Sequence, residues 1–92
     1  MITAIVLINT GQGKTPGVAQ TLIDLPEVTE VYSVAGPYDL VAMVRVLQHD
    51  DLADVVAGRI QKIEGIETTN TLIAFQAYSQ RDLEAMWDIG NP

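Results

Sequence analysis

The fold is decided by the stretch Gly36-Pro37-Tyr38-Asp39 and the two apolar runs that flank it, 28–35 and 40–47. Both runs are rich in β-branched residues, which favour strands. The four residues between them favour a tight turn, because glycine frees the backbone, proline fixes φ and aspartate can accept a hydrogen bond within its own turn. The pattern predicts a long β-hairpin. A tyrosine and a carboxylate at a rigid loop tip are also suited to holding a small polar ligand.

The remaining segments place a strand and a helix before this hairpin, and a helix and a strand after it. The expected elements are a strand over 2–9, a helix over 15–25, the hairpin strands over 28–35 and 40–47, a helix over 50–64 and a strand over 66–78. Thr15 is the expected N-cap of the first helix, and Pro26 ends it. Asp50 or Asp51 caps the second helix, and Gly65 ends it.

This β-α-β-β-α-β order predicts a ferredoxin-like α+β sandwich, with a four-stranded antiparallel sheet and both helices on one face. Residues 1–78 form this domain. Residues 79–92 form a separate C-terminal tail, in which we expect a short helix over 79–89.

The strands are too apolar for a sheet that has water on one side. The third strand carries Leu40, Ala42, Val44 and Val46 on one side and Val41, Met43, Arg45 and Leu47 on the other. The first strand likewise carries Ile5 and Leu7 opposite Ala4, Val6 and Ile8. An antiparallel sheet with one wet face should alternate apolar and polar residues. We therefore expect at least a homodimer that packs sheet to sheet, in the manner of a dimeric α/β barrel.

Composition excludes several classes of function. The formal charge is −7 and the five cations are scattered, so we expect direct binding neither to nucleic acid nor to an anionic membrane. The chain has no cysteine, which excludes disulfides and thiolate chemistry. Its apolar start over residues 1–9 has no charged leader region and is too short to span a bilayer, so we expect a cytoplasmic protein.

Two motifs that suggest bound groups have simpler explanations. The segment 11–15, Gly-Gln-Gly-Lys-Thr, resembles a phosphate-binding loop, but Ile8 stands where that motif needs its first glycine. The segment His49-Asp50-Asp51, with Asp54 beyond it, contains metal-ligating residue types, yet acidic residues are also favoured at a helix N-terminus. We expect neither a metal nor a cofactor.

Catalysis also has little support. The single histidine cannot form a Ser/His/Asp group, and the first loop lacks the arginine cradle of an acylphosphatase. The alternative is a small dimeric enzyme of the monooxygenase type, or a heme- or aromatic-binding protein. It requires a buried polar pocket around His49, Arg45 or Tyr78.

One further polar group lies on the last strand. Thr69 and Thr71 share a face at a spacing of two, together with Ile73 and Phe75. The strand propensity of threonine accounts for them equally well. If this strand meets the hairpin tip in an assembly, the hydroxyls and the Asp39 carboxylate suit the carboxylate and ammonium groups of an amino acid.

The stretch 31–40 resembles the Gly-x-Tyr-Asp hairpin of the RAM domain, the effector domain of Lrp/AsnC-type transcriptional regulators. The segment 68–72, Thr-Thr-Asn-Thr-Leu, is similar to the last strand of that domain. The resemblance covers about residues 1–78. It implies sheet-to-sheet dimers that assemble into rings of eight or ten subunits, an octamer or a decamer, with free amino acids bound between dimers.

Carried over position by position, the resemblance implies that the loop side of this pocket is Gly36, Pro37, Tyr38 and Asp39, and the strand side Thr69 and Thr71. No helix-turn-helix segment precedes the first strand, so we expect a stand-alone RAM protein. Its expected function is non-enzymatic: it binds an amino acid effector and modulates transcription through oligomerisation or through a full-length regulator of the family. A pure assembly scaffold is the other non-enzymatic alternative.

Overall fold

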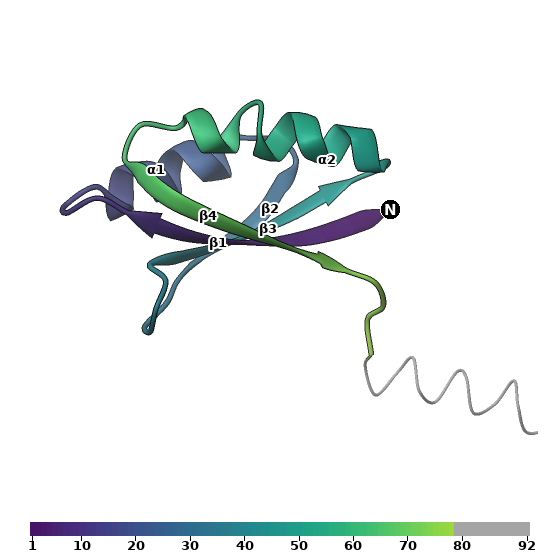
Figure 1. The fold of residues 1–92 in the computed structure, drawn as a ribbon, viewed down its shortest axis with the longest axis horizontal. Coiled ribbons are helices and arrows are strands. Elements are labelled where there is room, and N and C mark those ends of the chain that lie inside the picture. Colours follow the sequence, from purple (N-terminus) through teal and green to yellow (C-terminus); the bar gives the residue numbers. More distant parts are fainter. Residues whose placement is uncertain (79–92) are drawn as a thin grey trace, which may run out of the picture.

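The computed structural model describes residues 1–78, which form one antiparallel sheet with helices on a single face (Figure 1). The elements are β1 (Ile2–Thr10), α1 (Thr15–Ile23), β2 (Val28–Ser33), β3 (Leu40–Val46), α2 (His49–Val56), the 3-10 helix η1 (Ile60–Lys62) and β4 (Ile66–Ala74). The strand order is β2-β3-β1-β4. The predicted ferredoxin-like fold is therefore confirmed. The expected helix over 79–89 and the tail 79–92 lie outside the described residues.

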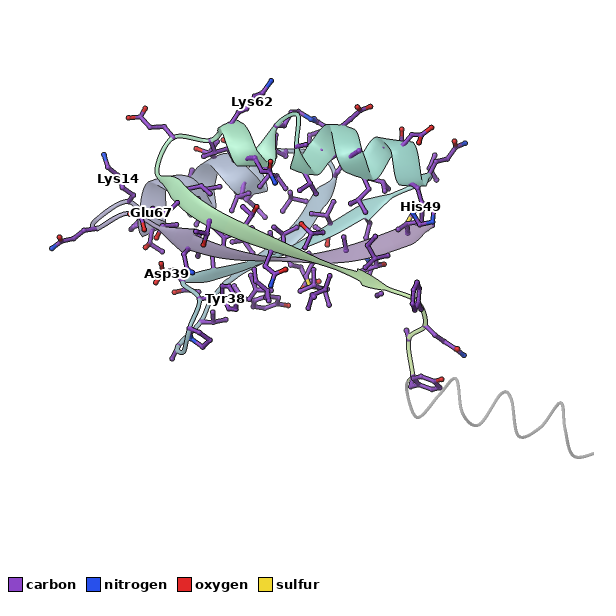
Figure 2. The ribbon with its side chains drawn as sticks, viewed as in Figure 1. Lys14, Tyr38, Asp39, His49, Lys62 and Glu67 are labelled. Atoms are coloured by element: carbon purple, nitrogen blue, oxygen red, sulfur yellow. The ribbon has the colours of Figure 1, made fainter. Side chains whose placement is uncertain are left out.

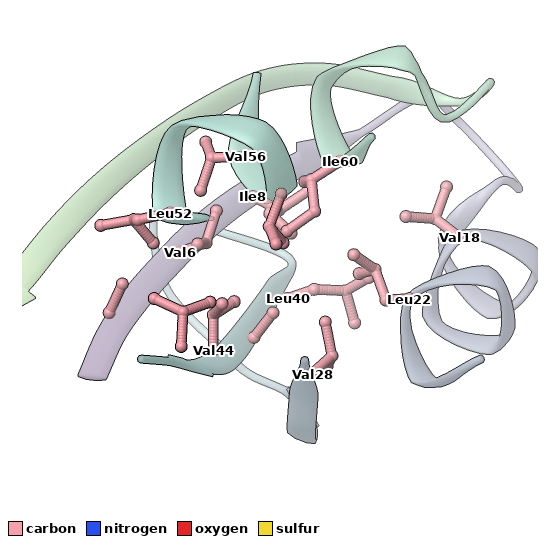
Figure 3. Close-up of a cluster of buried hydrophobic side chains, with 14 residues drawn as sticks. Val6, Ile8, Val18, Leu22, Val28, Leu40, Val44, Leu52, Val56 and Ile60 are labelled. Carbon is pink, nitrogen blue, oxygen red and sulfur yellow. The ribbon is translucent and has the colours of Figure 1, made fainter. Parts of the chain in front are cut away.

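The core lies between the sheet and the helices, and alternate residues of β1 and β3 build its lower layer. The buried apolar residues of these two strands are Ala4, Val6, Ile8, Leu40, Ala42, Val44 and Val46. Val18 and Leu22 from α1, and residues of α2 and η1, cover them (Figure 3). The two strand faces are thus those that the period-two pattern predicts.

The second helix is interrupted, although the sequence pattern predicts one helix over 50–64. It ends at Val56, and the 3-10 helix begins at Ile60 after a turn. A Cβ atom at Gly58 would lie 2.3 Å from the carbonyl oxygen of Asp54, so the chain bends at a position that only glycine tolerates. The bend still delivers the fully buried Ile60 to the core.

The strands on the sheet edges are shorter than expected. β2 ends at Ser33 rather than residue 35, and β4 ends at Ala74 rather than residue 78. Ser33 pairs with Leu40, the first residue of β3, and Ala74 pairs with Thr3 near the start of β1. One backbone bond follows the first pair, from the Val34 N–H to the Asp39 carbonyl, whereas Ile2 of β1 has no partner on β4.

The helix starts differ in part from the predicted caps. Lys14, not Thr15, is the N-cap of α1, and it makes no side-chain capping bond. The Thr15 hydroxyl instead lies 2.6 Å from the Thr10 hydroxyl. At α2 the predicted cap is wrong, because the N-cap is Gln48 rather than Asp50 or Asp51. The Asp51 carboxylate lies at the third helical position and accepts a hydrogen bond of 3.2 Å from the Gln48 backbone N–H.

Candidate functional site

Two loops meet at the end of the sheet that carries the hairpin tip. The Gly11 N–H donates to the Gly65 carbonyl over 2.8 Å, which joins the loop after β1 to the turn before β4. Gly65 has φ +101°, and a Cβ there would lie 2.9 Å from a methyl group of Val18 and 3.1 Å from Lys14 Cβ. This close contact holds the end of β1 in place.

Asp39 connects the hairpin to that end of β1. Its Oδ2 atom accepts hydrogen bonds from the Thr10 N–H at 2.9 Å and from the Thr10 hydroxyl at 3.3 Å. Its own N–H donates to the Ile8 carbonyl at 2.9 Å, and its carbonyl accepts from the Val34 N–H at 3.1 Å. Because the Thr10 hydroxyl donates its proton to Asp39, it accepts that of Thr15. Within residues 1–78, the other oxygen, Oδ1, accepts no hydrogen bond.

The loop that precedes Asp39 is open to solvent at its tip. Residues 34–37 are exposed, and Gly36 has φ +127° with nothing within 4 Å of an added Cβ. In the described part of the chain, the N–H groups of Ala35, Gly36 and Tyr38 donate to no other group. The tip therefore presents a set of uncommitted donors beside a fixed carboxylate.

Tyr38 turns from this loop toward the sheet. It is half-buried, and its hydroxyl accepts a hydrogen bond of 3.3 Å from the side-chain amide of Asn70 on β4. Figure 2 shows Tyr38 on the side of the sheet opposite the helices, and Asp39 beside it at the end of the sheet. The hairpin thus contacts both β1 and the edge strand β4.

Thr69 and Thr71 point the other way within one chain. They pair with Ile8 and Val6, whose side chains form the core, so all four residues lie on the helix-covered face. The Thr69 hydroxyl accepts a hydrogen bond of 3.2 Å from the Gln61 side chain. A shallow groove of about 250 Å³ opens at this point, lined by Gln61, Ile66, Glu67, Thr68 and Thr69. The chain by itself therefore does not bring these hydroxyls to the hairpin tip.

Two residues at this end were missed from the sequence, Thr10 and Asn70. Asn70 is unusual inside a strand, because asparagine is depleted there, and that was the available signal. Thr10 carried none, since it lay just beyond the expected end of the first strand.

The face of the sheet away from the helices is apolar in its middle. Five apolar side chains point to this side. Four of them are half-buried, Ile5, Leu7, Val41 and Met43, and the fifth, Leu72 on β4, is 48% exposed. No helix among residues 1–78 lies on this face (Figure 1). We call these five side chains the open face.

The residues of the alternative, enzyme-like pocket are scattered. His49 and Arg45 are exposed, and Tyr78 is 70% exposed on the segment after β4. Among residues 1–78, no group of three His, Asp or Glu side chains is arranged to hold a metal ion. In the same part of the chain, no helix combines the length and apolarity needed to cross a membrane.

The side chains whose pKa is shifted lie away from the hairpin tip. A hydrogen bond from Arg59 at 2.5 Å lowers the pKa of the Glu27 carboxyl, and the same contact raises the pKa of Arg59. On β2, the Tyr32 hydroxyl donates to Glu30, and this bond raises the pKa of Tyr32. The first pair joins the turn before β2 to the turn after α2.

The sequence, compared with known families, matches the model of the Lrp/AsnC ligand binding domain over residues 3–83. The chain belongs to the Lrp/AsnC family. It is 34% identical over 79 residues to the HTH-type transcriptional regulator FL11 of Pyrococcus furiosus, a match that covers 86% of this chain and 52% of that regulator. The chain thus spans about half the length of the curated regulators it matches.

Solved structures agree with this family. The protein TTHA0845 from Thermus thermophilus superposes with a TM-score of 0.82 at 49% identity, over 87% of this chain and 100% of that one. The feast or famine regulatory protein Rv3291c of M. tuberculosis, solved in complex with L-methionine, superposes with a TM-score of 0.69 at 29% identity. That match covers 88% of this chain and 55% of the M. tuberculosis chain.

Proposed function

We propose that this chain is a non-enzymatic effector module that binds a free amino acid at its hairpin tip. The observation that carries the proposal is the state of Asp39. Its Oδ2 is fixed by Thr10, whereas its Oδ1 accepts no hydrogen bond within residues 1–78. A half-buried carboxylate with one uncommitted oxygen, held rigidly beside free N–H donors, suits an α-ammonium and α-carboxylate pair.

In this pocket Oδ1 of Asp39 accepts from the ligand's ammonium, and the N–H groups of Gly36 and Tyr38 donate to its carboxylate. Pro37 fixes one φ angle of the loop, so part of the ordering of the tip is complete before the ligand binds. The second wall comes from a neighbouring copy, whose groove at Thr69 is polar and open, with Thr71 further along the same strand.

Association of copies is the second part of the proposal. The open face groups five apolar side chains that no helix of residues 1–78 covers, and a contiguous apolar surface of this kind marks an interaction site. A second copy that packs its own open face against this one covers both surfaces and makes an isologous dimer. Further association of dimers then brings the hairpin tip of one copy to the β4 groove of another.

The output of the module is a change in assembly that another protein reads. A full-length regulator of the same family, which carries its own DNA-binding part, has the matching domain and is the partner we propose. The net charge of −7 gives this chain itself no attraction to DNA.

Calorimetric titration of the purified protein with each common amino acid tests the proposal. We expect one amino acid, or a chemically related few, to bind. Asp39→Asn keeps an oxygen for Thr10 but removes the charge, so it should weaken binding by about 10- to 100-fold, the effect of one charge-assisted hydrogen bond. Asp24→Asn, which removes a carboxylate at the far end of α1, is the matched control and should bind as the wild type does.

Two results contradict the proposal. One is a folded wild-type protein that gives no heat with any amino acid. The other is an Asp39→Asn variant that binds as tightly as Asp24→Asn.

A further inference from the structure

The hairpin loop is attached to the sheet at two separate points. Asp39 is bonded to the end of β1 through Thr10, and Tyr38 is bonded to β4 through Asn70 at 3.3 Å. These are also the two half-buried residues of the loop, whereas residues 34–37 are exposed. The position of the tip therefore depends on both contacts.

The second attachment point, Asn70, lies beside the open face on the same side of the sheet. Asn70 pairs with Leu7 of β1, and Leu7 pairs with Val41 of β3, so the three side chains lie in a row on the side away from the core. Tyr38 lies on that same side (Figure 2). The tyrosine ring thus borders the apolar surface that the proposed second copy covers, while its own backbone N–H belongs to the proposed ligand site.

We infer that the Tyr38–Asn70 contact couples amino acid binding to association through the open face. The inference rests on the proposed function and assigns Asn70 as the positioning residue for Tyr38. A ligand held by the loop N–H groups and Asp39 orders the exposed tip, and with it the Tyr38 ring at the rim of the dimer interface. A copy that docks there then loses less conformational entropy.

Coupling of this kind is reciprocal. If the amino acid strengthens dimer association by some factor, dimer formation strengthens amino acid binding by the same factor. Couplings of this type are typically about 5- to 150-fold. One neutral hydrogen bond accounts for the lower end of that range.

The chain contains a matched control contact. The side-chain amide of Asn9 on β1 donates to the hydroxyl of Thr68 on β4 over 3.2 Å, on the same side of the sheet as the open face. Its chemistry is that of the Tyr38–Asn70 bond, an amide N–H to a hydroxyl. It does not involve the hairpin loop, so its loss should leave the coupling intact.

The test measures the dimer dissociation constant by sedimentation velocity over a dilution series, with and without the amino acid identified by calorimetry. For the wild type we expect the amino acid to lower this constant by about 5-fold or more. For Tyr38→Phe, which keeps the ring and removes the hydroxyl, we expect a ratio near one. For Asn9→Ala, which removes the control contact, we expect the wild-type ratio. Asn70→Ala should behave as Tyr38→Phe does, and it replaces that variant if Tyr38→Phe does not fold.

The outcomes separate the two proposals. A wild-type protein that binds an amino acid, but whose coupling survives in Tyr38→Phe and Asn70→Ala, overturns this inference and leaves the proposed function standing. Loss of coupling in Asn9→Ala as well also overturns it, because a contact outside the hairpin loop then has the same effect. A wild type that binds no amino acid overturns both.

Discussion

Replacement of Gly65 by alanine should be among the most damaging single-methyl changes in this protein. Two costs add at this position. At φ +101° an L-residue is strained, which costs about 1–2 kcal/mol. The new Cβ would also lie 2.9 Å from Val18 and 3.1 Å from Lys14, and overpacking of this kind costs about 1–3 kcal/mol. We expect a total loss of about 2–5 kcal/mol in the free energy of unfolding.

Two other glycines separate these costs. Gly13 has φ +73° but nothing within 4 Å of an added Cβ, so Gly13→Ala should cost only the backbone strain, about 1–2 kcal/mol. Gly17 lies inside α1 with open space around it and no positive φ, so Gly17→Ala should stabilise the protein by about 0.5–1 kcal/mol.

The assay is urea unfolding of all four proteins, followed by circular dichroism at one protein concentration, because association shifts the apparent stability. From the most to the least stable protein, the expected order is Gly17→Ala, wild type, Gly13→Ala and Gly65→Ala. If Gly65→Ala were no less stable than Gly13→Ala, the packing of the Gly65 turn against Val18 would be wrong. The contact between Gly11 and Gly65 would then not hold the end of β1 that carries Asp39's partner Thr10.

Two further changes test other contacts. Thr10→Val removes the buried hydroxyl that donates to Asp39 but keeps the backbone bond, so the free energy of unfolding should fall by about 1 kcal/mol, and an unchanged value would argue against the network. Arg59→Ala tests the ion pair with Glu27. Since Arg59 lowers the pKa of Glu27 below its ordinary 4.5, the pair stabilises the fold above pH 4.5 and loses this effect as the pH falls through the lowered value. The difference in Tm between wild type and Arg59→Ala should therefore shrink on acidification, and a difference independent of pH would contradict this.

The faces of β1 and β3 were predictable because both are central strands with a strong apolar alternation. The helix-side residues of these strands, such as Val6 and Ala42, are fully buried, as the period of two indicated. The turn at Gly36 was predictable for a similar reason, since its residues have restricted and specific backbone preferences.

The faces of β4 were harder to assign. This edge strand carries polar residues on both sides over 68–71. A shift of its pairing register by one residue would therefore exchange one polar side for another, and the sequence gives no reason to prefer either register. Only its pairing with β1 shows that Thr69 faces the helices and Asn70 faces Tyr38. The break in the second helix was likewise hidden, because apolar spacing continues through Gly58 to Ile60 and the steric conflict with Asp54 exists only in the folded chain.

The divided use of the Asp39 carboxylate has a consequence for how related proteins are compared. One oxygen closes the hairpin onto Thr10, and this bond is needed whether or not a ligand is ever present. Selection for a stable fold alone would therefore keep an aspartate or an asparagine at this position. Its presence in a relative is no diagnosis of amino acid binding, and a relative that has lost its effector would still carry it. Under the proposed coupling, the neighbouring tyrosine and its asparagine partner, which lie outside the core, mark an effector site that is linked to association.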